Sequence, residues 1–148
     1  MGFSQISKIL VIATFLAGCA GGNQVNFSEE VTSSPDRATL VFKRGTELTY
    51  ALAAARIKVN GTSVGKLSRG KSIVEPVSSG KVNVEVTMAL NPGSSGLTLN
   101  VENGKVYNFN ISPRGGVLSN SFGALGVLVS GQEKGQNGPF QLQLIDVK

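Results

Sequence analysis

The sequence of 148 residues contains no histidine, no tryptophan and a single cysteine, Cys19. A Ser-His-Asp triad, a Cys-His pair, a histidine general base and a histidine-based zinc site all need residues that this chain lacks. A lone cysteine also rules out an intramolecular disulfide. We therefore predict a protein with no catalytic residues, no metal site and no cofactor, which is stabilised by burial and by sheet hydrogen bonds.

Long apolar runs and dense charge runs are also missing. The apolar segment 9–17 falls well short of the roughly 20 residues that a transmembrane helix needs, so we expect no membrane-spanning anchor. The 14 lysines and arginines exceed the 9 aspartates and glutamates, but they are spread along the chain. This distribution favours a solvated surface over a binding patch, and it argues against a nucleic-acid partner.

The segment before Cys19 has the layout of a secretory signal peptide. Lys8 precedes the uncharged residues 9–17, and the sequence Leu-Ala-Gly-Cys ends at Cys19. This sequence resembles the lipobox of bacterial lipoproteins, which implies a diacylglycerol on the Cys19 sulfur, cleavage before Cys19 and acylation of the new amine by a fatty acid such as palmitate. Each buried methylene contributes about 0.8 kcal/mol, so two or three acyl chains would hold the protein on a membrane.

A lone cysteine can also be a buried apolar residue or a reactive thiolate. The Ala-Gly-Gly sequence that follows it is too flexible to position a nucleophile, so we favour lipidation. Ala20, in place of aspartate, resembles the pattern of lipoproteins sent to the outer membrane in Gram-negative bacteria of the enteric type. We therefore predict a lipid-anchored cell-envelope protein with a signal peptide at 1–18, a lipidated flexible tether at 19–36 and one domain at 37–148.

Most of the predicted domain alternates apolar and polar residues with the period of two that is typical of half-buried β-strands. Asn60-Gly61 and Asn103-Gly104 are turn signals between such segments, and we predict a hairpin at each. Residues 46–55 favour a helical turn or an irregular crossover. The predicted strands are 37–44, 56–59, 63–67, 72–77, 81–88, 97–101, 107–111 and 140–144.

Three further features mark where predicted strands end. Residues 78–80 indicate a turn and residues 91–96 a loop, and the alternation changes phase after Leu144, which predicts a bulge or a strand end there. Together these patterns predict an all-β fold, an antiparallel β-sandwich of about seven or eight short strands with at most one short helix. A closed barrel is the alternative.

Residues 115–132 contain no charged residue, which is unusual for a loop. On a helical period, Leu118, Phe122, Leu125 and Val129 form one apolar stripe. We favour packing of this segment onto the sandwich. The alternative is an apolar loop in which these four residues contact the membrane or a partner protein.

Two other patterns indicate chemistry less strongly. Glu75 and Glu85 lie on adjacent predicted strands and are candidates for the carboxylate pair that glycoside hydrolysis uses. Exposed strand faces carry such charges routinely, so we predict that the protein is not an enzyme. Tyr50 and Tyr107, with several asparagines, offer contacts to a glycan, but Tyr107 alternates with Phe109 as a core residue does.

The alternating segments and turn glycines between residues 37 and 111 resemble a family of short bacterial lipoproteins with an all-β domain of unknown function. The central part of this region also resembles the PEGA type of surface-associated β repeat. It departs from that repeat at the turn after which the repeat is named, where this chain has Val-Ser-Ser-Gly at 77–80. The resemblance implies an extracytoplasmic domain with no established catalytic residues. It rests on residues 38–44, 57–61, 64–67, 70, 80–86 and 104–107.

These observations favour a membrane-anchored envelope lipoprotein whose non-catalytic domain binds or scaffolds another envelope component. The anchor, the tether and the absence of a catalytic constellation all point this way. A lipoprotein that binds the cell wall or a glycan is the alternative.

Overall fold

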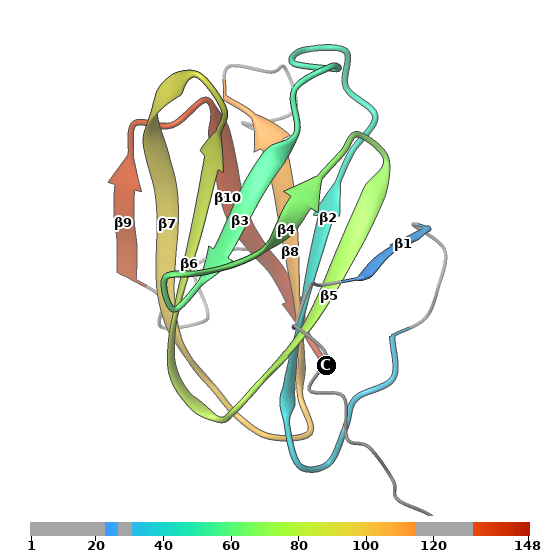
Figure 1. Cartoon of the computed structure of the whole chain (residues 1–148). Helices are drawn as coiled ribbons and strands as arrows, with labels where there is room; N and C mark the ends of the chain where they lie inside the picture. The colour runs from blue at the N-terminus through green and yellow to red at the C-terminus, as the bar shows by residue number, and fades with distance from the viewer. Residues whose placement is uncertain (1–22, 27–30, 115–131) are drawn as a thin grey trace, which may run out of the picture.

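The computed structural model describes residues 23–26, 31–114 and 132–148, and in this part of the chain it is all-β, with no helix (Figure 1). Eight of the described strands form two sheets of four that face each other, and a short strand extends one edge of each sheet. The predicted β-sandwich is therefore confirmed.

The strands of the sandwich divide evenly between the sheets. The first sheet, in spatial order, contains β1 (Asn23–Asn26), β5 (Lys71–Val77), β2 (Ala38–Arg44), β8 (Val106–Pro113) and β10 (Phe140–Val147). The second contains β4 (Thr62–Leu67), β3 (Ala55–Val59), β6 (Gly80–Met88), β7 (Asn91–Val101) and β9 (Gln132–Gln136). Described neighbouring strands run antiparallel, except that β2 and β8 are parallel.

The core lies between the sheets and follows the period-two pattern. Val82, Val84 and Val86 of β6 are buried while the residues between them are more exposed, as the sequence predicts. From the first sheet, Phe42 and Phe109 stack with ring centroids 5.1 Å apart, because β2 and β8 place them side by side. Alternating strands from both sheets thus close one continuous core.

The predicted hairpin at Asn60-Gly61 is confirmed, and it joins β3 to β4. Both residues have positive φ angles, 51° for Asn60 and 81° for Gly61, as a type I′ turn requires. The Asn60 side-chain oxygen also accepts a hydrogen bond from the backbone N–H of Asn83, at 2.9 Å. This bond fixes the turn against the neighbouring strand β6.

The hairpin predicted at Asn103-Gly104 is wrong, because β7 and β8 lie in different sheets. The turn carries the chain from one layer to the other, after which β8 pairs in parallel with β2. The loop predicted at 91–96 is also wrong. These residues form the first half of β7, where Ser94 and Gly96 pair with β6.

Other local predictions are confirmed. Residues 46–54 form an irregular crossover with turns between β2 and β3, and the pairing of β10 with β8 shifts register between Leu144 and Asp146, as a bulge does. β1 falls within the predicted tether, and its backbone pairs with the outer edge of β5 from Asn23 to Asn26.

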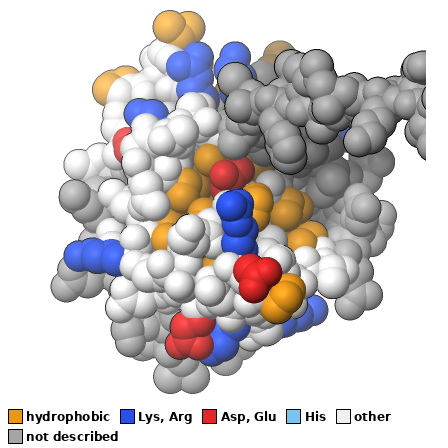
Figure 2. Space-filling view, turned by 60° about the horizontal axis from the view of Figure 1, so that its bottom comes forward, with side chains coloured by type: hydrophobic (Ala, Val, Ile, Leu, Met, Phe, Trp, Pro, Cys, Tyr) orange, Lys and Arg blue, Asp and Glu red, His pale blue; other side chains and the backbone are white. Residues whose placement is uncertain are grey.

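The connections collect at two ends of the sandwich, which we call the upper and lower ends after their positions in Figure 1. The upper end carries the crossover 45–54 and the turns 68–70, 89–90 and 137–139. The lower end carries the Asn60-Gly61 turn, the inter-sheet connections after β5 and β7, and the carboxyl terminus. Figure 2 shows the lower end, where hydrophobic side chains are visible in the middle of the face.

Candidate functional site

At the upper end, the buried side chain of Arg44 fixes the crossover 45–54 to the sandwich. Its guanidinium donates hydrogen bonds to the carbonyl oxygens of Tyr50 (2.7 Å), Leu67 (3.2 Å) and Ala53. Only 1% of the residue is exposed, and burial lowers the pKa of the guanidinium, an effect that the carboxylate of Glu47 opposes. Arginine stays charged in this setting, so its bonds to the crossover are charge-assisted.

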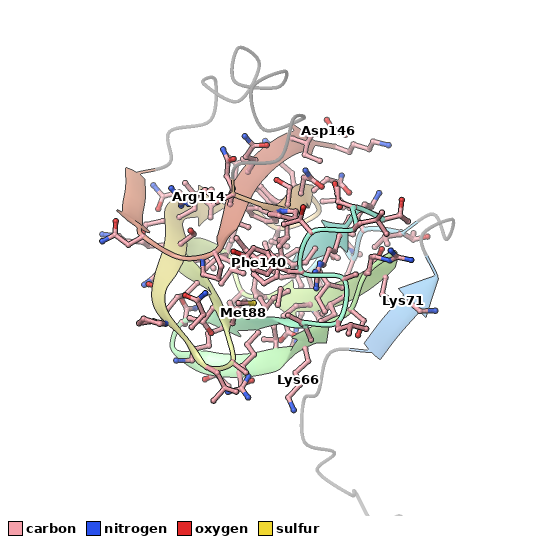
Figure 3. The ribbon with its side chains drawn as sticks, turned by 90° about the horizontal axis from the view of Figure 1, so that it is seen from above. Lys66, Lys71, Met88, Arg114, Phe140 and Asp146 are labelled. Atoms are coloured by element: carbon pink, nitrogen blue, oxygen red, sulfur yellow. The ribbon has the colours of Figure 1, made fainter. Side chains whose placement is uncertain are left out.

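The same guanidinium lies over an aromatic ring. Its central carbon is 4.6 Å from the centroid of Phe140, in a cation–π arrangement. The ring of Tyr50 meets Phe140 edge to face at 5.8 Å. Phe140 lies near the centre of the sandwich when it is viewed onto the upper end (Figure 3). The crossover is thus attached to the core through both a cation and a ring.

Although the crossover is held in place, its apolar side chains are not buried. Leu48 is 81% exposed and Leu52 is 104% exposed. Leu90, in the turn between β6 and β7 at the same end, is 106% exposed and has a φ of 61°. We call Leu48 and Leu52 of the crossover the leucine surface. The sequence gives no signal that distinguishes them from core leucines.

The rest of the upper end is also well connected. Arg114 donates from Nε to the carbonyl oxygen of Gly138 at 2.9 Å and from Nη2 to the hydroxyl of Ser95 at 3.0 Å. The Ser95 hydroxyl in turn donates to the carbonyl oxygen of Phe140 at 2.5 Å. This network ties β7, the end of β8 and the start of β10 together.

The lower end has a hollow of about 400 Å³ between the two sheets. Its walls come from the β3–β4 hairpin on one side and from the ends of β5 and β6 on the other. Four valines form its apolar part, and polar side chains surround them. The lining residues are Val59, Asn60, Thr62, Val64, Glu75, Val77, Ser78, Ser79, Lys81 and Val82.

Glu75 faces this hollow from the inner side of β5. It alternates with Ile73, which is fully buried, and with Val77, which packs against the core. Burial raises the pKa of the Glu75 carboxyl, and no charged neighbour contributes to the shift. The expectation that Glu75 lies on an exposed strand face is wrong, because Glu75 shares the phase of Ile73, which faces inward.

Glu75 and Glu85, the candidate carboxylate pair on strands that are adjacent in sequence, do not lie on neighbouring strands of one sheet. Glu75 lies on β5 in the first sheet, whereas Glu85 lies on β6 in the second, where it pairs with Lys58 and Gly96. The two strands follow each other in sequence but belong to opposite layers. The fold therefore places the two candidate carboxylates in opposite sheets.

The tyrosines differ in their roles. Tyr107 is buried, and its hydroxyl oxygen accepts a hydrogen bond from the backbone N–H of Glu102 at 2.9 Å, which identifies it as a core residue. Tyr50 is partly exposed at the upper end, with its ring against Phe140. The two therefore do not form one aromatic platform for a glycan.

Several predicted residues lie outside the described part of the chain. These are Cys19 and the proposed partner contacts Leu118, Phe122, Leu125 and Val129. Within the described residues, no three His, Cys, Asp or Glu side chains form a group that would hold a metal ion. Nor does the described part contain a helix that is long and apolar enough to span a membrane.

No family model matches the chain, and no curated protein or solved structure is significantly similar to it.

Proposed function

We propose that this chain is a lipid-anchored protein of the bacterial cell envelope whose β-sandwich, without catalysing a reaction, binds another envelope protein through the leucine surface. Support for the anchor comes from the sequence, where the Leu-Ala-Gly-Cys motif follows an export signal. The acyl chains on Cys19 would supply the membrane attachment. The resemblance to short bacterial lipoproteins agrees with this assignment.

The observation that carries the binding proposal is the exposure of Leu48 and Leu52 on a crossover that Arg44 holds in place. Transfer of a leucine side chain from water to an apolar surface contributes about 1.5–3 kcal/mol. A loop that is already ordered loses little further conformational entropy when it binds, so more of this free energy remains for affinity. The partner that fits this surface is a protein with an apolar groove.

A protein partner is favoured over a bilayer by the aromatic content of this end. Side chains that insert into membrane interfaces are enriched in tryptophan and tyrosine. The chain has no tryptophan, and the ring of Tyr50 packs on Phe140. Leucines on a crossover that is already held in place suit a preformed apolar groove, because each contributes binding free energy when the groove buries it.

Site-specific photo-crosslinking in cells tests the proposal. A photoreactive residue replaces Leu52 in the lipidated full chain, and the control carries it at Asn100, an exposed residue on the outer face of β7. We expect one envelope protein to crosslink from position 52 and not from position 100, and we expect Leu48→Ser to abolish that adduct. Equal adducts from both positions would overturn the proposal, and adducts to lipid or to cell-wall glycan from position 52 would do the same.

A further inference from the structure

The hollow at the lower end lies far from the leucine surface and has a different chemistry, because one carboxylate stands among valines. Val59, Val64, Val77 and Val82 supply apolar walls from four strands, and Glu75 projects into the same space from β5. Buried or half-buried carboxylates are usually paired with a cation. The Glu75 carboxylate is therefore a candidate binding group for a cation.

Within the part of the chain that the structure describes, no cation forms an ion pair with Glu75. Glu102, for comparison, has an ion-pair partner in Lys105, with 2.7 Å between the Glu102 carboxylate and the Lys105 ammonium. Lys81 also lines the hollow, but no ion pair joins its ammonium to the Glu75 carboxylate. The carboxylate thus lacks a partner cation within its own hollow.

A metal ion does not fit this site. Divalent metal ions in proteins take several oxygen, nitrogen or sulfur ligands. Glu75 is the one carboxylate in the lining, and no cluster of three metal-ligating side chains occurs among the described residues. The apolar walls would also leave a metal ion without ligands on most sides. The cation must therefore carry an apolar body of its own.

The polar lining specifies the type of organic cation. Quaternary ammonium groups are recognised by aromatic cages, and this lining contains no aromatic residue. The hydroxyls of Thr62, Ser78 and Ser79 in the lining instead offer acceptors for N–H donors. A volume of about 400 Å³ is at the small end of the range for small-molecule sites.

We propose that the hollow between the β3–β4 hairpin and the ends of β5 and β6 binds a primary ammonium group on an aliphatic chain, with Glu75 as the counter-ion and the four valines around the methylenes. Such a group occurs on free alkylamines and on the lysine side chains of peptides, and both present the same chemistry to the hollow. This inference is independent of the proposed leucine surface, which lies at the other end.

Titration of the full chain with n-hexylamine, in a neutral detergent and with methyl NMR detection, tests the site. We expect saturable shifts of the valine methyls in the hollow, with the methyls of the leucine surface unchanged. Hexanol and hexanoate, which have the same apolar body without the ammonium, should not saturate the site. An N-acetyl-lysine amide that binds more tightly than hexylamine would identify peptide lysine as the source, and the reverse order would identify free amines.

Two variants make the test specific. Glu75→Gln, which keeps the shape of the side chain, should weaken hexylamine binding by at least about tenfold, because it removes a charge-assisted hydrogen bond. Glu85→Gln removes a carboxylate from the outer face of β6 and should leave the affinity unchanged. Shifts that do not saturate with the unmodified chain, or equal weakening by both variants, would overturn the proposal. The wild-type shifts decide the question even if Glu75→Gln unfolds the protein.

Discussion

The guanidinium of Arg44 lies 4.6 Å from the ring centroid of Phe140, so the end of β2 and the start of β10 meet through one cation and one ring. From this position Arg44 reaches three carbonyl oxygens, two in the crossover 45–54 and one at the end of β4. A single buried side chain thus holds together three segments that are distant in sequence.

Replacement of Arg44 by methionine should destabilise the fold and release the crossover. Methionine keeps an unbranched apolar stem but has no donor, so the carbonyl oxygens of Tyr50 and Leu67 lose their side-chain partner. We expect the free energy of unfolding in urea to fall by about 3 kcal/mol. We also expect limited proteolysis within residues 46–54 to become faster. The exposed Arg69→Met is the matched control, with an expected change below about 0.5 kcal/mol. Equal effects of the two variants would contradict this role of Arg44.

Two glycines should respond to alanine in a predictable order. Gly61 has a φ of 81° and no atom within 4 Å of an added Cβ, so Gly61→Ala meets only backbone strain of about 1–2 kcal/mol. At Gly93, with a φ of 106°, the added Cβ would lie 2.5 Å from the carbonyl oxygen of Asn137. Backbone must move there, so Gly93→Ala should cost at least about 1 kcal/mol more. Urea unfolding of both variants measures the order, and the reverse order would contradict the packing of the β9–β10 turn on β7.

The hollow at the lower end predicts how Glu75 changes stability with pH. Burial raises the pKa of the Glu75 carboxyl, so the folded chain holds this proton more tightly than the unfolded chain does. Ionisation of Glu75 therefore costs stability as the pH rises through the raised pKa, and the cost is absent below the unfolded value. Lys81 is the other charged residue in the lining.

Glu75→Gln should consequently raise the Tm at neutral pH and leave it nearly unchanged at about pH 3, where the carboxyl is protonated in both states. Thermal unfolding across this range measures the difference, and Glu85→Gln reports any effect common to the loss of a carboxylate. If Glu75→Gln raised the Tm by the same amount at every pH, the gain would not come from removing a buried charge, and this account of Glu75 would be contradicted.

The predicted anchor is tested at Cys19. Cys19→Ala removes the sulfur that would carry the diacylglycerol, so the protein should move from the membrane fraction to the soluble fraction or remain as an uncleaved precursor. Mass spectrometry of the wild-type protein should show acyl chains on residue 19. Recovery of an unmodified Cys19 from membranes would contradict the lipoprotein assignment.

The features that sequence predicts correctly in this fold are those that depend on near neighbours. The Asn60-Gly61 turn requires positive φ at two adjacent residues, and asparagine followed by glycine satisfies this requirement locally. The bulge after Leu144 is visible as a change of phase within one strand. Strand β6 is predicted because its valines alternate over its own length.

Pairing between distant strands was not predictable in the same way. Asn103-Gly104 has the same two residues as the β3–β4 turn, but it joins strands of opposite sheets. The apolar residues Val101 and Tyr107 on either side both face the core. Alternation around a turn looks the same whether two strands pair in one sheet or face each other across the core, so it could not decide between them.

The candidate sites were hidden for a related reason. Leu48 and Leu52 lie in an apolar, alanine-rich segment, and no local pattern reveals that they are exposed or that Arg44 bonds to this segment. The inward position of Glu75 could have been predicted, because Glu75 shares the period-two phase of Ile73 and Val77. A charged residue at an inward position of a strand is the signal that would have identified the hollow.

The most direct test of the account compares partner recovery by matched variants of the lipidated chain in cells. After crosslinking, Leu48→Ser combined with Leu52→Ser should recover at least about tenfold less of the envelope protein bound by the wild type, because two apolar anchors are lost. Ile145→Ser, which changes an exposed apolar residue on β10, should recover it at the wild-type level. Equal recovery by all three proteins would contradict the central claim that the leucine surface binds the partner.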